Sequence, residues 1–295
     1  MSLPAAFVSV VVIWSTTPLA IKWSTLGIGS SFAVLSRMAL GALLCGLLLL
    51  VLRIRFPIHR KARLSYLASG LSMFAAMSLT YWSAQYVSSG MISVMYGLSP
   101  LITSFAAILW LKEEAVTTAK MAGMLLGITG LVLVFQGGLN LGEGAMLGLA
   151  ALLVAVMSQS LGLVWMKKIG DDSPPLATTF GTLLVGLPLL FIVWWLSDGH
   201  LPAVIPTRAV IATLYLASFG SVLGFMLYYY MIKYMEAGRI MLITLITPVM
   251  ALLLGHGLNH EEVLPHVWFG TVFILFGLCM HRWGTLWLAY LPARR

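Results

Sequence analysis

The chain has 295 residues, of which 60% are hydrophobic and only 9% are charged, and its mean hydropathy is +0.99. This composition excludes a soluble globular domain and predicts an integral membrane protein. The net charge of +8 requires no nucleic-acid partner, because basic loops beside the anionic inner leaflet of a membrane account for it.

Segments long enough to cross a membrane follow one another along the whole chain. A spanning helix needs about 20 mostly apolar residues, and cutting the chain at charged or Pro/Gly-rich breaks gives ten candidates. They are Leu3–Lys22, Phe32–Leu52, Leu64–Tyr86, Met91–Leu111, Ala119–Phe135, Ala145–Met166, Pro175–Ser197, Ala209–Ile232, Arg239–Leu258 and Pro265–Arg282.

A pattern in the third and fourth segments recurs in the eighth and ninth. Each residue of the second copy lies 148 positions after its counterpart: Tyr81, Tyr86, Gly90, Pro100, Glu113 and Glu114 recur as Tyr229, Tyr234, Gly238, Pro248, Glu261 and Glu262. Because each copy holds five spans, an odd number, the second copy must be inverted relative to the first. The predicted fold is an all-α membrane protein of ten transmembrane helices, built from inverted five-helix repeats at 1–140 and 141–295.

The basic residues predict an orientation, because cytoplasmic loops carry an excess of Lys and Arg. With the amino terminus inside, 14 of the 17 basic residues fall on the inner side: Arg53, Arg55, Arg60, Lys61, Arg63, Lys112, Lys120, Lys167, Lys168, Lys233, Arg239, Arg282, Arg294 and Arg295. We therefore expect a multi-pass protein of the plasma membrane with both termini in the cytoplasm.

Two classes of chemistry lack their sequence patterns. The chain contains no Gly-Lys dipeptide, so the phosphate-binding loop of an ATPase is excluded. His256, His260 and His266 fall at a span end and in a loop, where solvated histidines are far more common than metal ligands. No cofactor and no metal site are expected.

All nine acidic residues are assigned to loops or span ends. Carboxylates within the membrane mark many proton relays, so proton exchange through a buried carboxylate is disfavoured, as is a permanently cationic substrate. The Glu-Glu pairs, such as Glu261 and Glu262, are expected to stabilise the amino terminus of the following helix through its dipole.

Paired prolines predict the position of a binding site. Tyr96, Ser99 and Pro100 in the fourth segment occupy the same repeat positions as Thr244, Thr247 and Pro248 in the ninth, and both prolines follow a hydroxyl residue. A proline frees a backbone carbonyl one turn earlier, which is tolerated at membrane depth only against protein or a water-filled cavity. We interpret Pro100 and Pro248 as hinges or gates and the neighbouring polar residues as substrate-binding; two packing kinks are the alternative.

Three further groups are candidates for substrate binding. Met73, Met77 and Tyr81 lie at i, i+4 and i+8 on one helix face, and the repeat mate of Tyr81 is Tyr229. The polar residues of the first and sixth segments are Trp14, Thr16, Ser158 and Gln159. Plain packing and helix–helix hydrogen bonds are the alternatives for these groups.

Two other features have structural interpretations. Arg37 could receive a substrate carboxylate, but its place near the outer face favours snorkelling to the headgroups or a structural role. Small residues let helix backbones approach closely, so the glycines of the fifth and tenth segments predict packing surfaces or a homodimer interface. These are Gly123, Gly127, Gly130, Gly270 and Gly277.

Together these residues resemble the drug/metabolite transporter superfamily, in its ten-span amino-acid and metabolite exporter branch. The resemblance rests on the duplicated Gly/Pro/Glu-Glu segment, Trp14 with Ser15, Lys22 and Arg37. Within that branch the chain is most similar to bacterial aromatic amino acid exporters. This implies a bacterial inner membrane and a central cavity against the third, fourth, eighth and ninth segments, with the first and sixth contributing. The pair before Pro100 is Leu98 and Ser99, where those exporters are expected to have an aromatic residue, which favours a broader range of amino acids.

The sequence therefore predicts a secondary transporter, not an enzyme, that exports neutral amino acids or related metabolites by alternating access. Its partners would be a small-molecule substrate and membrane lipid. Efflux of drugs or another metabolite is the alternative within transport. An intramembrane hydrolase, suggested by Gly70-Leu71-Ser72 and Gly97-Leu98-Ser99, lacks a base near either serine, because only His256 and His281 lie near spans.

Overall fold

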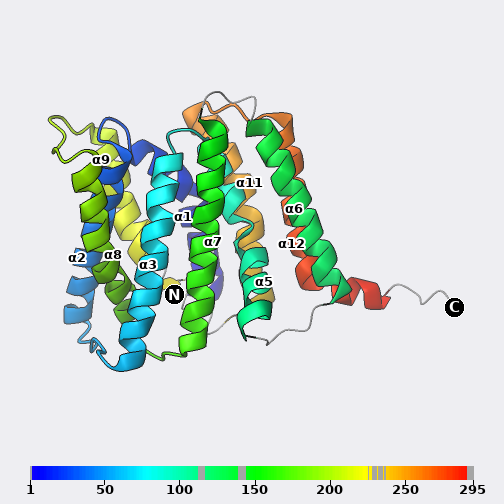
Figure 1. Ribbon diagram of the computed structural model, residues 1–295, viewed down its shortest axis with the longest axis horizontal. Coiled ribbons are helices and arrows are strands. Elements are labelled where there is room, and N and C mark those ends of the chain that lie inside the picture. Colours follow the sequence, from blue (N-terminus) through cyan, green and yellow to red (C-terminus); the bar gives the residue numbers. More distant parts are fainter. Residues whose placement is uncertain are drawn as a thin grey trace.

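The computed structural model describes residues 2–111, 117–138, 144–224, 226–227, 231, 235 and 237–290, without the side chains of 137–138, 237–241 and 285–290. All regular elements in these ranges are helices, and most run between the two ends of one bundle (Figure 1). In chain order they are α1 Leu3–Ser24, α2 Ser30–Val51, α3 Arg60–Ser83, α4 Ser89–Tyr96, α5 Ser99–Leu111, α6 Thr118–Gly138, α7 Ala145–Ile169, α8 Pro175–Ser197, α9 Thr207–Tyr215, the π-helix η1 Leu216–Leu223, α11 Ala237–Asn259 and α12 Pro265–Tyr290.

Eight helices in the described ranges are long and apolar enough to cross a membrane, so the chain is a multi-pass membrane protein. They are Leu3–Ser24, Ser30–Val51, Ser89–Leu111, Thr118–Gln136, Ala145–Ile169, Pro175–Ser197, Leu242–Asn259 and Pro265–Gly284. The helix α3 has 24 residues but begins with basic side chains and holds several hydroxyls, so it is less hydrophobic. A shorter apolar helix, Thr207–Leu223, combines α9 and η1.

Neighbouring helices come from distant parts of the sequence. The helix α3 packs on α7 and α8, α2 on α8 and η1, and α1 on α9 and α11. The helix α4 packs on α11, while α6 packs chiefly on α12, as Figure 1 shows at one side of the bundle. Fully buried side chains from α3, α4 and α7 form the centre of the core, among them Tyr81, Met91, Met95, Leu149 and Leu152.

The glycines of α6 and α12 face one another. A β-carbon on Gly277 would lie 2.6 Å from the carbonyl oxygen of Gly123, and one on Gly270 would lie 2.8 Å from that of Gly130. The two backbones therefore touch, as the packing interpretation predicts. These glycine faces are filled within the chain, and a homodimer stays a prediction.

The two prolines of the repeat lie in different local structures. The helix is interrupted at Gly97 and Leu98, between α4 and α5, and Pro100 is the second residue of α5. Pro248, in contrast, lies inside the continuous helix α11. A β-carbon on Gly97 would lie 3.5 Å from Cγ of Pro248, so the interruption is beside the second proline.

Loops gather at two ends of the bundle. At the Arg60 end, which holds the 52–59 and 170–174 loops, Nε2 of His59 lies 3.6 Å from Oδ1 of Asp171. At the opposite end, the Lys22 end, Nζ of Lys22 donates to the carbonyl of Val87 at 2.8 Å and lies 3.8 Å from Oε1 of Glu261. Glu261 also binds Ser89 at the start of α4, so its expected pairing with the following helix is wrong.

Candidate substrate-binding region

Hydrogen bonds between side chains join the first five helical segments to the rest of the chain within the bundle. Oγ1 of Thr16 in α1 and the hydroxyl of Tyr215 in α9 are 2.6 Å apart. Oγ of Ser99 in α5 lies 3.1 Å from Oγ of Ser160 in α7. Because lipid offers no partner to a hydroxyl, such pairs hold helices together or bind a polar solute.

Arg37 lies at the centre of another polar group. Its Nε donates to Oγ of Ser221 in η1 at 3.2 Å, and its Nη1 donates to the hydroxyl of Tyr81 at 3.4 Å. The side chain of Tyr81 is fully buried, and Arg37 is only 5% exposed. Of the two roles expected for Arg37, snorkelling is wrong, since its guanidinium is enclosed by α3 and η1, and the hydrogen bonds to Ser221 and Tyr81 are compatible with the structural role.

A third group surrounds the interrupted helix. The hydroxyl of Tyr96 in α4 lies 2.9 Å from Oγ1 of Thr80 in α3. On α7, Ser158 and Gln159 are half-buried. Oε1 of Gln159 is buried and has no hydrogen-bond partner among the described residues, which leaves an acceptor inside the bundle.

The Met and Trp candidates contribute apolar contacts. Met73 and Met77 are half-buried against the main core, and Met73 reaches α8, where its Cε would lie 2.5 Å from a β-carbon on Gly186. Trp14 packs on a smaller cluster formed by Ala6, Val10, Met231 and Ile243. Packing accounts for the positions of Met73 and Trp14 in this structure. Substrate binding by these side chains would be a second role beside packing.

The second repeat contributes part of its predicted residues. Thr247 is buried in α11, next to Pro248, and Thr244 is half-buried one turn earlier. Tyr229 lies outside the described residues. The predicted residues thus come from α1, α3, α4, α5, α7 and α11, and Thr16, Tyr81, Tyr96 and Ser99 are hydrogen-bonded to other polar side chains.

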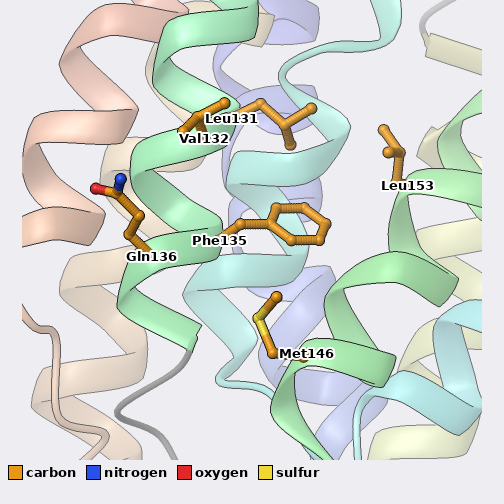
Figure 2. A pocket seen from close by; sticks show the side chains of 6 residues that line it. All are labelled: Leu131, Val132, Phe135, Gln136, Met146 and Leu153. Atoms are coloured by element: carbon orange, nitrogen blue, oxygen red, sulfur yellow. The ribbon is translucent and has the colours of Figure 1, made fainter.

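An apolar groove of about 350 Å³ lies elsewhere, between α6 and α7 (Figure 2). Its lining is Leu131, Val132, Phe135, Gln136, Met146 and Leu153. None of the predicted site residues belongs to it. One amide among five apolar side chains suits hydrocarbon better than a polar solute.

Sequence reasoning missed three partners in these groups. Tyr215, Ser221 and Thr80 complete the pairs with Thr16, Arg37 and Tyr96. A π-helix leaves no reliable pattern in a sequence, so the approach of Ser221 could not be predicted. Arg37 itself offered a signal, because it is a charged residue within an apolar span.

Both serines of the hydrolase alternative have oxygen partners. Ser99 pairs with Ser160, and Oγ of Ser72 donates to the carbonyl of Ser69 at 3.0 Å. A nucleophilic serine needs a base within hydrogen-bond reach. Neither of these contacts supplies one.

A sequence profile described as the EamA-like transporter family matches residues 3–136 and 146–283. The chain belongs to the EamA-like transporter family. This places it in the drug/metabolite transporter superfamily, as its residues predict. Members of the EamA-like family are transporters, not enzymes.

Relatives of this EamA-like protein include two bacterial transporters. The chain is 24% identical to the transporter YoaV of Bacillus subtilis (strain 168) over 276 residues, which cover 93% of this chain and 94% of YoaV. It is 27% identical to the inner membrane transporter YedA of Escherichia coli (strain K12) over 201 residues, 68% of this chain and 64% of YedA.

A solved crystal structure has a similar fold. Its superposition on this EamA-like chain has a TM-score of 0.66 at 17% sequence identity and covers 96% of this chain and 98% of the solved one. The similarity extends along nearly the whole chain, so the solved structure supports the helical architecture.

Proposed function

We propose that the protein is a secondary transporter that exports neutral amino acids, aromatic ones included, or related small metabolites by alternating access. The observation that carries this proposal is the pairing of uncharged polar side chains between the two parts of the chain. Thr16 with Tyr215, 2.6 Å apart, and Ser99 with Ser160, 3.1 Å apart, are the two such pairs that involve predicted site residues. Hydroxyls that form hydrogen bonds between helices can instead bind the polar groups of a zwitterionic solute.

The architecture of this proposal is ten spans in two inverted repeats, 1–140 and 141–295. Adding α3 and the shorter helix Thr207–Leu223 to the eight apolar helices gives ten. The family profile matches two segments that flank residue 140, which supports the division.

The packing of the helices supports the repeat as well. The proposed repeat counterparts are α1 and α7, α3 and α9–η1, and α5 and α11. If each helix is replaced by its counterpart, the helix contacts of one repeat become those of the other. The contact of α3 with α7 becomes that of α9 with α1, and the contact of α5 with α7 becomes that of α11 with α1. Contacts that interchange in this way are expected of two repeats related by a pseudo-two-fold axis.

The hinge in this proposal is the region of Pro100 and Pro248. The interruption between α4 and α5 lies against Pro248, so one movable joint can involve both repeats. Discontinuous helices at the repeat interface form the substrate sites of many transporters. Tyr96, Ser99 and Thr247 lie within one turn of these prolines and are the proposed binding residues there.

The proposed orientation places the Arg60 end in the cytoplasm of a bacterial cell, with both termini inside and the protein in the inner membrane. Seven basic residues flank the loops at this end: Arg53, Arg55, Arg60, Lys61, Arg63, Lys167 and Lys168. The inner-membrane relative YedA supports the location. Lipid surrounds the bundle, and a homodimer would have to use faces other than the α6–α12 glycines.

Counterflow of radiolabelled Phe, Thr and Met into liposomes that contain the purified protein tests the proposal. Saturable exchange of these solutes is expected. Ser99→Ala should slow it several-fold, while Ser197→Ala, at the exposed end of α8, should exchange like the wild type. An imposed pH gradient separates proton coupling from facilitated diffusion. Exchange of drugs or sugars without any amino acid would favour the alternative of general efflux.

A further inference from the structure

The one basic side chain well inside a described span is enclosed by protein. Arg37 is the eighth residue of α2, so it lies about 10 Å along the helix from Ser30 at 1.5 Å per residue. Its side chain is 5% exposed. A guanidinium stays charged under all physiological conditions, so this charge lies permanently within the bundle.

The partners of this guanidinium are neutral. They are the hydroxyls of Ser221 and Tyr81, and no carboxylate of the described residues pairs with Arg37. Asp198, the carboxylate that bonds to the same helix, binds Ser31 at the start of α2. Two other acidic residues, Asp171 and Glu261, have partners at opposite ends of the bundle.

A charge inside a membrane protein is normally paired or functional, because its desolvation is costly and hydroxyls compensate only part of that cost. Arg37 has five donors, of which two serve Ser221 and Tyr81. The remaining donors and the uncompensated charge can bind an anionic group that enters the bundle from solution.

The helical segment that faces Arg37 is a π-helix, a geometry that occurs frequently at functional sites. Ser221 and Gly220 lie in the π-helix η1, Leu216–Leu223. A β-carbon on Gly220 would lie 3.4 Å from Nη2 of Arg37 and 3.7 Å from Oγ1 of Thr17. Nη2 of Arg37 and the hydroxyl of Thr17 therefore both lie beside Gly220, which has no side chain. Thr17 directly follows Thr16, which belongs to the proposed site.

We propose that Arg37 binds the carboxylate of the transported solute and so restricts the substrates to carboxylate-bearing molecules. A single carboxylate balances the single positive charge, and the planar guanidinium fork matches its two oxygens. Tyr81 and Ser221 hold the fork in place. This inference rests on the proposed transport function and deepens it, since it assigns a specificity-determining residue to that function.

The test is competition against radiolabelled Phe counterflow in liposomes. Unlabelled 3-phenylpropionate keeps the carboxylate of Phe and lacks the amine, whereas phenylalaninamide keeps the amine and lacks the carboxylate. A site built to bind one polar group rejects an analogue without it. With wild-type protein, the half-inhibitory concentration of 3-phenylpropionate should therefore be lower than that of phenylalaninamide by about tenfold or more.

Variants separate recognition from structure. In Arg37→Gln and Arg37→Lys the preference for the carboxylate analogue should fall, most in Arg37→Gln, while a purely structural role would weaken both analogues alike. Arg208→Gln is the matched control, because Arg208 is exposed and stacks on Trp23 at 4.1 Å. It should keep the wild-type preference.

The outcomes are distinct. If Phe is exchanged but phenylalaninamide competes as well as 3-phenylpropionate, or if Arg37→Gln keeps the preference, the role of Arg37 is overturned and amino-acid transport stands. If the wild type exchanges Phe, Thr and Met no faster than empty liposomes, the proposed function fails and the role of Arg37 fails with it.

Discussion

Glu261 accepts two hydrogen bonds from Ser89, one from the backbone N–H at 2.8 Å and one from the hydroxyl at 2.7 Å. Ser89 is the first residue of α4, so the carboxylate satisfies a free donor at that helix start and interacts favourably with its dipole. Asn259 donates to the same carboxylate at 2.8 Å. With Lys22 nearby, Glu261 joins the ends of α1, α4 and α11.

Glu261→Ala should destabilise the protein by about 1–3 kcal/mol, because buried donors lose a charged acceptor. The carboxylate is only 7% exposed. The measurement is the thermal unfolding midpoint in detergent micelles. Glu262→Ala is the control, since Glu262 is exposed and should leave the midpoint unchanged. Equal midpoints for both variants would contradict the assigned role.

Pro100→Ala should slow transport more than it lowers the folded yield. Alanine restores the missing N–H, so a continuous helix can form across the α4–α5 interruption and stiffen the proposed joint. Counterflow rate per folded protein is the quantity to measure. Pro188→Ala is the control, because Pro188 lies inside the continuous helix α8 and is exposed. Wild-type rates in Pro100→Ala would remove the hinge assignment.

Gly277→Ala should separate α6 from α12. The new methyl group would meet two backbone atoms, the oxygen of Gly123 at 2.6 Å and the nitrogen of Gly127 at 2.8 Å. Backbone cannot rotate away as a side chain can, so a cost of about 1–3 kcal/mol is expected.

Gly257→Ala is the control for this substitution, because a β-carbon there meets nothing within 4 Å. Alanine favours a helix over glycine by up to about 1 kcal/mol, so this variant should be as stable as the wild type or more so. Unfolding in mixed micelles with increasing SDS measures both. Wild-type stability of Gly277→Ala would contradict the prediction, because it would mean that α6 and α12 can move apart without loss of stability.

Thr16 and Tyr215 should be energetically coupled. Their hydroxyls are 2.6 Å apart across α1 and α9, and hydrogen bonds between membrane helices contribute about 0.6 kcal/mol on average and up to about 1.7. A double-mutant cycle of Thr16→Val and Tyr215→Phe measures this coupling. Additive effects of the two substitutions would mean that the pair contributes nothing in the folded protein.

The sequence predicted the class of protein and most of its helices, because a long apolar segment is the main signal of a membrane span. The α7 helix, Ala145–Ile169, begins at the predicted residue, and α8 has both predicted ends. The proline of the fourth segment predicted a disturbed helix, and the α4–α5 interruption lies two residues before it. The hydroxyls that form pairs, such as Thr16 and Ser99, were visible because polar side chains are rare in such segments.

Only the tertiary structure decided which polar groups meet. Arg37 faces Ser221, 184 residues away, because η1 packs on α2, and no local pattern encodes that contact. The same holds for Glu261, whose side chain reaches α4 although the helix that follows it in sequence is α12. Sequence determines where a helix begins and how apolar it is, whereas the partner of each side chain depends on packing between distant segments.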